Sequence, residues 1–289
     1  MTHLHDDKIK FLEEKAIEVR KSIIEALVEA KSGHTAGPLG MADIFTAFYF
    51  HILKQDPKNP TWEDRDRVVL SNGHICPVLY SAMAHAGYFP VEEMKTLRKF
   101  GTRLQGHPHR EYLPMLETSS GPLGQGLSQA VGMAIVDRLD RGQNSNRTVY
   151  CFLGDGELNE GQVWEAVLLA GREKLHNLVA IVDRNNIQID GFTETVMPLE
   201  PLADKWSAFG WHVLEIDGHN MEAIVDAVDE ARAIFEKPSV IIAHTIPGKG
   251  VEMFEHDYKW HGNPPNKEQG ANAMAELRTL GGRIVSEHE

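Results

Sequence analysis

Two short segments, Gly154-Asp155-Gly156 and Asn185-Asn186, carry side chains that suit a metal site. Each follows a β-branched apolar run, so each is expected at the end of a strand. Asp155 supplies a carboxylate and Asn185 a carboxamide oxygen, while the glycines let the backbone turn tightly against a ligand. Mg²⁺ usually takes one or two carboxylates and completes its octahedron with carbonyl, water and phosphate oxygens. Asp-Gly alone is most often a turn, but the Asn-Asn pair after the next strand favours a metal-bridged diphosphate.

Histidine is a second candidate for chemistry, with 15 copies among 289 residues. His34, His74, His107 and His261 each stand beside a glycine in a predicted loop, where core residues are uncommon. An imidazole titrates near neutrality, so it can take a hydroxyl proton or stabilise charge that develops on oxygen. Taken singly, each of these histidines is more often structural or solvated.

The first third of the chain predicts helices that deliver these residues to loops. Apolar residues at spacings of three and four predict an amphipathic helix over 7–31 that stops at Ser32-Gly33, just before His34. A mostly buried helix is expected over 41–53 and a short strand over 67–71, directly before His74. Residues 101–117 lack periodicity and predict a long irregular loop, a kind of segment that is usually functional.

From residue 120 onward, short β-branched runs alternate with helical patterns, which predicts an α/β fold with a mainly parallel sheet covered on both faces. The predicted helices are 124–141, 161–175, 199–209 and 220–236, and the predicted strands are 148–153, 178–182, 212–216 and 240–244. Ligands of such folds bind at the carboxyl ends of the strands, so the loops after Leu70, Leu153, Val182 and His244 are expected to form the site. We expect a single domain over 1–289, with an extended polar tail from about Pro264.

Composition narrows the classes of partner. The formal charge is −13, from 29 Lys and Arg against 42 Asp and Glu, which disfavours a nucleic-acid or anionic-membrane surface. A mean hydropathy of −0.31 and the lack of a long apolar run predict no membrane span. The two cysteines form no metal-type pair and the N-terminal residues do not look like a signal peptide, so a cytoplasmic location is expected.

The motifs taken together resemble the thiamine diphosphate enzymes and, within them, the transketolases. The matching segments, in family order, are SGHTAGPLG from Ser32, LSNGH from Leu70, GHP from Gly106, SSGPLGQGLS from Ser119, GDGELNEG from Gly154, NNIQIDG from Asn185, and HG at His261. Deoxyxylulose phosphate synthases and the E1 chains of 2-oxo acid dehydrogenases share the GDG and NN fingerprint but differ at the SGH, GHP and GPLGQG segments. The resemblance implies the three-layer thiamine diphosphate-binding fold.

The resemblance also implies roles for individual residues. Asp155, Asn185 and the main-chain carbonyl of Ile187 would hold Mg²⁺ or another divalent cation such as Ca²⁺ or Mn²⁺. The cofactor would be bound by His74, Gly121, Leu123, Gly156 and Ile189, with His74 and the Gly156 N–H on its diphosphate, Gly121 and Leu123 on its aminopyrimidine and Ile189 near its thiazolium. His34, His107 and His261 would surround the reacting carbons of the sugar. Glu160 would be a buried glutamate between the two active sites of a dimer, unless it only satisfies the dipole of the following helix.

Two departures from the family pattern, Thr35 in place of a proline and Pro247 in place of a lysine, affect the expected substrate choice and not cofactor binding. A full transketolase is about twice as long, so the resemblance implies the N-terminal subunit of a split enzyme. A separate C-terminal subunit would carry the pyrimidine-binding domain and the assembly would be α2β2. The substrates would be a ketose phosphate and an aldose phosphate, of the pentose phosphate pathway or of specialised sugar catabolism. The alternatives are the α chain of another thiamine diphosphate enzyme, acting on 2-oxo acids or ketoses, and a non-catalytic partner-binding homologue.

The remaining candidates are predicted to be structural. Trp164, Val167 and Leu168 at helical spacing are expected in the core. Cys151 is expected to be inert within a strand, and Cys76 has no neighbour that would make it a nucleophile. Lys249, between two glycines, could reach a phosphate or pair with one of the many carboxylates.

Overall fold

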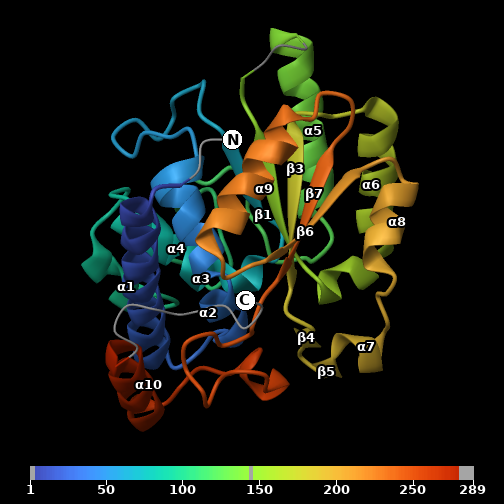
Figure 1. Ribbon diagram of the computed structural model, residues 1–289. Coiled ribbons are helices and arrows are strands. Elements are labelled where there is room, and N and C mark those ends of the chain that lie inside the picture. Colours follow the sequence, from blue (N-terminus) through green and yellow to red (C-terminus); the bar gives the residue numbers. More distant parts are fainter. Residues whose placement is uncertain (1–3, 143–145, 280–289) are drawn as a thin grey trace.

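A five-stranded parallel sheet runs through the centre of the molecule (Figure 1). The computed structural model describes residues 4–142 and 146–279. Across the sheet the strand order is β1 (Arg67–Leu70), β2 (Val149–Gly154), β3 (Leu178–Arg184), β7 (Ser239–His244) and β6 (His212–Asp217). Every pair of neighbouring strands is parallel, with Val149 opposite Leu178 and Val179 opposite Ser239. The prediction of an α/β fold with a mainly parallel sheet is confirmed.

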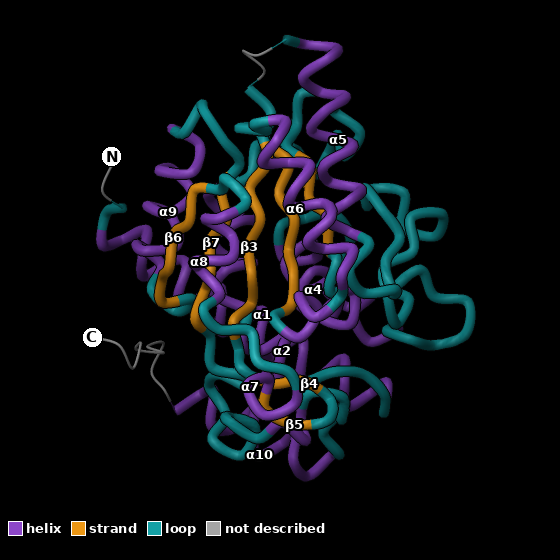
Figure 2. The backbone as a smooth tube through the Cα atoms, turned by 90° about the vertical axis from the view of Figure 1, so that its right-hand side faces the viewer, coloured by secondary structure: helices purple, strands orange, loops and turns teal. Residues whose placement is uncertain are grey.

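Helices cover both faces of the sheet, and the alternation of side chains along the strands divides the interior into two cores. On one face, α1 (Asp6–Ala30), α3 (Ala42–Ala47), α4 (Cys76–His85) and α9 (Met221–Ala233) pack against residues such as Tyr150 and Phe152. On the other, α5 (Gly126–Arg141), α6 (Gly161–Glu173) and α8 (Leu202–Ala208) pack against Val149, Cys151 and Leu153. Figure 2 shows the sheet from the side of α5, α6 and α8. This arrangement is the expected three-layer fold.

The predicted elements between residues 124 and 244 are all present, with ends that move by no more than three residues. Helix α1 ends slightly before its predicted stop, because Lys31 takes a left-handed conformation (φ 52°) and donates its N–H to Leu27 O. The predicted helix over 41–53 is α3 followed by a π-helical turn over Phe48–Ile52. The segment 101–117 has no helix or strand, as predicted.

The prediction of an extended C-terminal tail is wrong for most of the described residues of this segment, which form a helix. Helix α10 (Lys267–Thr279) lies against α1, and its Ala273 and Leu277 are buried there. The two helices approach so closely that a Cβ on Gly270 would lie 2.4 Å from Cγ2 of Val28. Residues 280–289, the rest of the predicted tail, lie outside the described part of the chain.

Several shorter elements were not predicted. They are α2 (Ala36–Gly40), α4 (Cys76–His85), α7 (Thr193–Val196), the hairpin of β4 (Ile187–Gln188) with β5 (Gly191–Phe192), and short 3-10 turns that include Gly73–Ile75, Val91–Thr96, Gly156–Asn159 and Tyr258–Trp260. The predicted core position of Leu168 is wrong, because its side chain is 57% exposed, whereas Val167 is buried and Trp164 packs at the edge of the core. Within 4–142 and 146–279, no helix has the length and apolarity needed to cross a membrane.

Candidate cofactor site and active site

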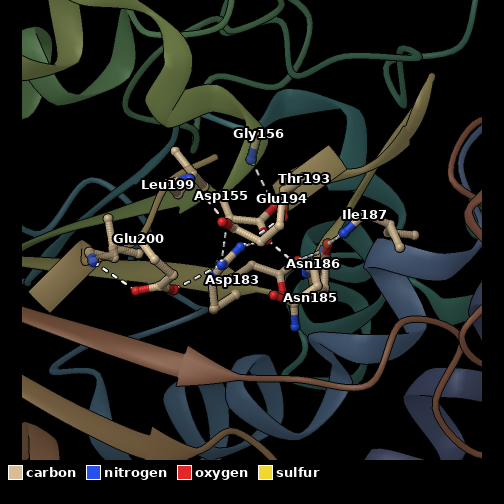
Figure 3. Close-up of polar contacts among 12 residues, drawn as sticks. Asp155, Gly156, Asp183, Asn185, Asn186, Ile187, Thr193, Glu194, Leu199 and Glu200 are labelled. Carbon is tan, nitrogen blue, oxygen red and sulfur yellow. Dashed lines mark hydrogen bonds and ion pairs between the residues drawn. The ribbon is translucent and has the colours of Figure 1, made fainter. Parts of the chain in front are cut away.

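Asp155 and Asn185 lie side by side at the carboxyl ends of β2 and β3 (Figure 3). Asp155 is 1% exposed, and its carboxylate accepts hydrogen bonds from the backbone N–H of Gly156 and of Asn186, each at 2.7 Å. Asn185 Oδ1 accepts the N–H of Ile187 at 3.0 Å. Parallel pairing of the strands therefore places the predicted carboxylate and carboxamide at one edge of the sheet.

A second buried carboxylate, Asp183, lies behind this pair and was not predicted. It accepts a hydrogen bond from Nδ2 of Asn185 at 2.8 Å, which orients the carboxamide. Burial raises the pKa of Asp183 to about 7, and the Asp155 charge adds to the shift. Burial also raises the pKa of Asp155 to about 6, against the opposing effect of Arg184. A cation bound here would favour the ionised forms of both acids.

Unpartnered polar atoms lie beside the Gly154-Asp155-Gly156 turn and beside Gly73 of the His74 loop. Side-chain atoms of Asn72, Ser120 and Gln188 are buried without a hydrogen-bond partner. A Cβ on Gly154 would lie 3.7 Å from Cβ of Asn72, and one on Gly156 would lie 3.2 Å from Cβ of Gln188. Buried polar atoms in native proteins are nearly always satisfied, so these atoms have hydrogen-bonding capacity left for a polar ligand or an ordered water.

The same residues test the fit of Mg²⁺ and a diphosphate. The described residues contain no group of three or more His, Cys, Asp or Glu side chains arranged to hold a metal. A cation at Asp155 would therefore depend on amide, carbonyl and phosphate oxygens, which is the usual situation of Mg²⁺. The oxygen ligands and the unpartnered donors fit a magnesium diphosphate. Asn72, Ser120 and Gln188 all stand in segments that carried the family resemblance, so the signal for them was present in the sequence.

Four predicted histidines meet beside this turn, although they come from separate loops. The ring centroid of His34 lies 4.9 Å from that of His74, 6.4 Å from that of His107 and 5.6 Å from that of His261. The rings of His74 and His261 are 5.1 Å apart. The structure thus brings together a cluster of imidazoles, which we call the histidine cluster: His34, His74, His107 and His261.

Burial keeps the imidazoles of the histidine cluster uncharged at neutral pH. Burial lowers the pKa of His34 and of His261 to about 4, and the neighbouring imidazoles add to the shift at His34. Burial also lowers the pKa of His74 and of His107. Neutral imidazoles can accept a proton at pH 7, and the Nδ1 atoms of His34 and His261 are buried without a partner.

Two of the other predicted cofactor contacts, Gly121 and Ile189, lie against the loops of the histidine cluster. A Cβ on Gly121 would lie 4.0 Å from Cγ of His107, and one on Gly262 would lie 3.5 Å from Cδ1 of Ile189. Leu123 and Ile189 are 39% and 62% exposed. Both are therefore open to a ligand or to a further protein surface.

The buried glutamate of the GDGELNEG segment is Glu157, whereas Glu160 is exposed in this chain. The Glu157 carboxylate accepts hydrogen bonds from the Ser71 hydroxyl, the Gly124 N–H and the Gly154 N–H. It therefore joins three of the motif segments, a role that the sequence analysis missed. Glu160 lies at the start of α6 and close to Gly124, since a Cβ on Gly124 would lie 2.8 Å from the Cβ of Glu160.

Thr35, one of the two departures from the family pattern, connects two histidine loops. Its N–H donates to Trp260 O at 3.4 Å, and its hydroxyl donates to Asn263 O at 2.6 Å. A proline at this position has no N–H and no hydroxyl to donate. Thr35 thus ties the loop of His34 to the loop of His261.

The two cysteines are buried, and burial raises the pKa of both thiols, that of Cys76 to about 12. Both are therefore in the unreactive thiol form at neutral pH.

The fold and the site can be compared with known proteins. The family model described as "Transketolase, thiamine diphosphate binding domain" matches residues 13–281. The chain belongs to the transketolase family. Transketolases transfer carbon units between sugars, and the matched part is the N-terminal domain that binds thiamine diphosphate. The predicted family and fold are confirmed.

Transketolase relatives of two lengths are similar to this chain. It is 44% identical to 6-deoxy-6-sulfo-D-fructose transketolase subunit SqwG of Clostridium sp. (strain MSTE9), over 93% of this chain and 97% of that protein. It is 41% identical to one of the apulose-4-phosphate transketolase subunits of Phocaeicola vulgatus, over 93% of this chain and 95% of that protein. The solved transketolase of Leishmania mexicana superposes with a TM-score of 0.87 at 36% identity, over 92% of this chain but 41% of that one.

Proposed function

We propose that this chain is the thiamine diphosphate-binding subunit of a two-subunit transketolase, which moves a two-carbon ketol unit from a ketose phosphate to an aldose phosphate. The observation that carries the proposal is the histidine cluster, because its loops also contact the Asp155–Asn185 region: Asn72 of the His74 loop lies against Gly154, and Gly262 lies against Ile189. Two similar proteins of nearly the same length are named as transketolase subunits, which supports a separate partner chain. An intact cluster argues against a non-catalytic homologue, and family membership argues against an α chain of another thiamine diphosphate system.

Mg²⁺, or Ca²⁺ or Mn²⁺ in its place, would be held by Asp155, Asn185 and the carbonyl of Ile187. The diphosphate would take hydrogen bonds from the Gly156 N–H and from His74. When bound, thiamine diphosphate supplies the electron sink that allows a carbon–carbon bond next to a carbonyl to break. The protein's part is to hold this group in a dry pocket at a fixed angle.

In this proposal His34, His107 and His261 handle protons at the sugar. A buried neutral imidazole accepts the proton of a sugar hydroxyl through its unprotonated nitrogen, and as imidazolium it returns the proton to oxygen on which charge develops. The low pKa values of the histidine cluster keep the accepting form populated at neutral pH. Such general acid–base assistance contributes roughly 10²- to 10⁴-fold to a rate.

The partner would cover the carboxyl edge of the sheet. Apolar side chains stand exposed there on the β4–β5 hairpin and α7, namely Ile189, Phe192, Val196 and Met197. Exposed apolar groups that gather in one place are typical of a protein interface. A second subunit with the pyrimidine-binding domain would bury this surface and complete the pocket, with Glu160 at the contact between two sites in an α2β2 assembly.

The substrates are sugar phosphates, and we propose a cytoplasmic enzyme of pentose phosphate metabolism. The names of the two related subunits give two different sugars as substrates. The residues that this chain shares with both of them therefore do not determine which sugar is bound. No nucleic acid or membrane partner is proposed.

Reconstitution tests the proposed function. The purified chain should show no ketol transfer by itself in the presence of Mg²⁺ and thiamine diphosphate, and should gain it when mixed with a candidate C-terminal subunit. Full activity of the isolated chain, free of host transketolase, would contradict the two-subunit proposal. Activity of the mixture that survives His261→Ala undiminished would contradict the role of the histidine cluster.

A further inference from the structure

We propose that Arg98 is a positioning residue that fixes the loop of His34 against the loop of His107. The inference rests on the proposed function, because it assigns Arg98 to the support of two proposed catalytic histidines. Arg98 comes from neither loop: it follows the 3-10 turn Val91–Thr96, in a segment that the sequence analysis left without a role.

The guanidinium of Arg98 bridges the two loops by hydrogen bonds. Its Nη1 donates to the Ser32 hydroxyl at 3.0 Å, and its Nη2 donates to the Gly106 carbonyl at 3.2 Å. Ser32 is two residues before His34, and Gly106 is next to His107. A planar guanidinium with several fixed donors can hold both acceptors at once, which an ammonium on a flexible stem does less well.

The backbone around Arg98 is shaped to hold its side chain in this place. Arg98 takes a left-handed conformation with φ 60°, which is uncommon for a residue that is not glycine. Its own N–H donates to Leu104 O at 3.0 Å, which closes the chain into the turn that leads to His107. A conformation of this kind is kept only where the surrounding contacts stabilise it.

Two glycines make room for the guanidinium. A Cβ on Gly106 would lie 2.8 Å from both Cζ and Nε of Arg98, and one on Gly33 would lie 3.6 Å from Nε. These are the residues that directly precede His107 and His34. A glycine is needed before His107 because the Arg98 side chain packs against Gly106. A glycine is needed before His34 also because Gly33 has φ 134° and lies against Leu27.

The charge of Arg98 acts on the same two imidazoles. Burial has the largest effect on the pKa of His34, followed by the charges of His261, Arg98 and His107, all of which lower it. Burial and then the Arg98 charge lower the pKa of His107. The groups that face His34 are therefore Arg98 and the other three members of the histidine cluster, and those that face His107 are Arg98, His34 and His74. Removal of the cation should raise the pKa of both imidazoles.

Two substitutions separate geometry from charge. Arg98→Met removes the charge and the hydrogen bonds, whereas Arg98→Lys keeps the charge and loses the two-sided bridge. Arg103→Met is the matched control, because Arg103 lies five residues away in the same segment and pairs with Glu93 instead.

The first measurement uses the full chain without a partner, so it does not depend on ketol transfer. Histidine ring signals followed by NMR against pH should show higher pKa values for His34 and His107 in Arg98→Met, and values near wild type in Arg98→Lys and Arg103→Met. Amide hydrogen exchange at residues 32–36 and 104–108 should be faster in both Arg98 variants. Unchanged titration and exchange in Arg98→Met would overturn the inference whatever the reaction of the enzyme is.

The second measurement uses the assembled enzyme. Misplaced catalytic groups should lower kcat/KM by about 10- to 100-fold in both Arg98 variants, since a shift of about 1 Å can cost that much. The acidic limb of the pH profile should move to higher pH in Arg98→Met alone, and thiamine diphosphate affinity should stay within about twofold of wild type. Wild-type kcat/KM and an unmoved profile would contradict the positioning role. A missing ketol transfer in the wild type, together with the expected NMR shifts, would contradict the proposed function and leave the Arg98 inference standing.

Discussion

The carboxylate of Asp155 is already engaged with three donors before any cation binds. Two are backbone N–H groups and the third is Nη1 of Arg184 at 3.1 Å. Each carboxylate oxygen has two lone pairs, so one position remains on Oδ1 while Oδ2 is filled by Asn186 and Arg184. A metal would therefore approach Asp155 through Oδ1, on the side of Gly156.

Asp155→Asn should weaken binding of Mg²⁺ and thiamine diphosphate by about 10- to 100-fold, because it removes the one carboxylate assigned to the metal while keeping the shape of the side chain. Fluorescence titration or calorimetry with the cofactor, with and without Mg²⁺, measures the change. Asp190→Asn is the control, since Asp190 is exposed on the neighbouring hairpin. Equal affinities in Asp155→Asn and wild type would refute the metal assignment.

Glu157→Gln should lower the free energy of unfolding by about 1 to 3 kcal/mol. The carboxylate accepts from three donors, and an amide group would turn one of its own N–H groups toward them. Chemical denaturation of the isolated chain measures the loss. Glu160→Gln, three residues further along, should stay within about 0.5 kcal/mol of wild type, as is usual for exposed sites. An equal loss in both variants would contradict the importance of Glu157.

The two glutamates also show what a sequence can and cannot predict at the scale of single residues. Asp155, Asn185 and the histidine cluster could be found because glycines and strand ends surround them. Which glutamate of GDGELNEG is buried depends on the 3-10 turn Gly156–Asn159, which rotates Glu157 inward toward Ser71 and leaves Glu160 outside. No sequence period encodes such a short turn.

At the scale of elements, Arg184 connects the end of β3 with the segment that follows it. Besides Asp155, its guanidinium donates to the Thr193 hydroxyl at 2.8 Å and pairs with Glu194 and Glu200 at 2.8 and 2.9 Å. One buried cation thus holds the metal-site carboxylate, the start of α7 and Glu200, which follows α7.

Arg184→Met should release this segment, because Glu194 and Glu200 lose their partner and Asp155 its cation. Amide exchange at residues 187–200 should become faster, while exchange in β2 and β3 stays slow. Hydrogen–deuterium exchange with mass spectrometry measures both regions in one experiment. Arg172→Met is the control, since Arg172 is 76% exposed and pairs only at the surface with Glu173. Unchanged exchange at 187–200 would show that other contacts hold α7.

The elements that the sequence failed to predict share a weak pattern. Helix α4 is buried on nearly every side, so it shows no polar face, and α10 is polar except for a few residues such as Ala273 and Leu277. Strands β4 and β5 have two residues each, too few to show an alternation. The long amphipathic helices and the β-branched strands were predicted because a single period runs through many residues.

At the scale of the whole molecule, a buried ion pair links three parts of the fold on one face of the sheet. Arg20 of α1 makes two hydrogen bonds to Asp43 of α3, at 2.9 and 2.7 Å. His219, at the turn before α9, contacts the same carboxylate through Nδ1 at 2.8 Å and accepts the N–H of Ile246 at Nε2. Because Nε2 accepts a hydrogen bond, the proton of the neutral ring is on Nδ1, and His219 donates it to Asp43.

Asp43→Asn should lower the free energy of unfolding by about 3 to 5 kcal/mol at pH 7, because it leaves the fully buried guanidinium of Arg20 without a counter-charge. Burial raises the pKa of Asp43, but the charge of Arg20 and the hydrogen bonds from His219 and Arg20 outweigh it and hold the pKa well below its usual range. A lowered folded-state pKa means that the stabilisation is present above about pH 4 and is lost as the pH falls further.

The difference between wild type and Asp43→Asn should therefore be constant from pH 5 to 8 and shrink below about pH 4. Denaturant unfolding across this range measures it. Glu29→Gln breaks the exposed pair with Lys99 and serves as the matched control, with an expected change far smaller than that of Asp43→Asn, because solvent screens an exposed ion pair. A difference that grows in acid would contradict the assigned direction of the shift.

Strand β7 is the last strand of the sheet in the sequence, yet it lies between two strands that precede it. Strand β7 pairs with β3 on one side and β6 on the other, and β6 has no other neighbour in the sheet. During synthesis on the ribosome, β3 and β6 both leave the exit tunnel before Ser239–His244 can join them. Until then the nascent chain carries an open edge on a strand whose residues are all destined for burial, the kind of edge that recruits other chains. We therefore expect chains stalled before residue 239 to aggregate or bind chaperones, and chains released beyond it to close the sheet at once.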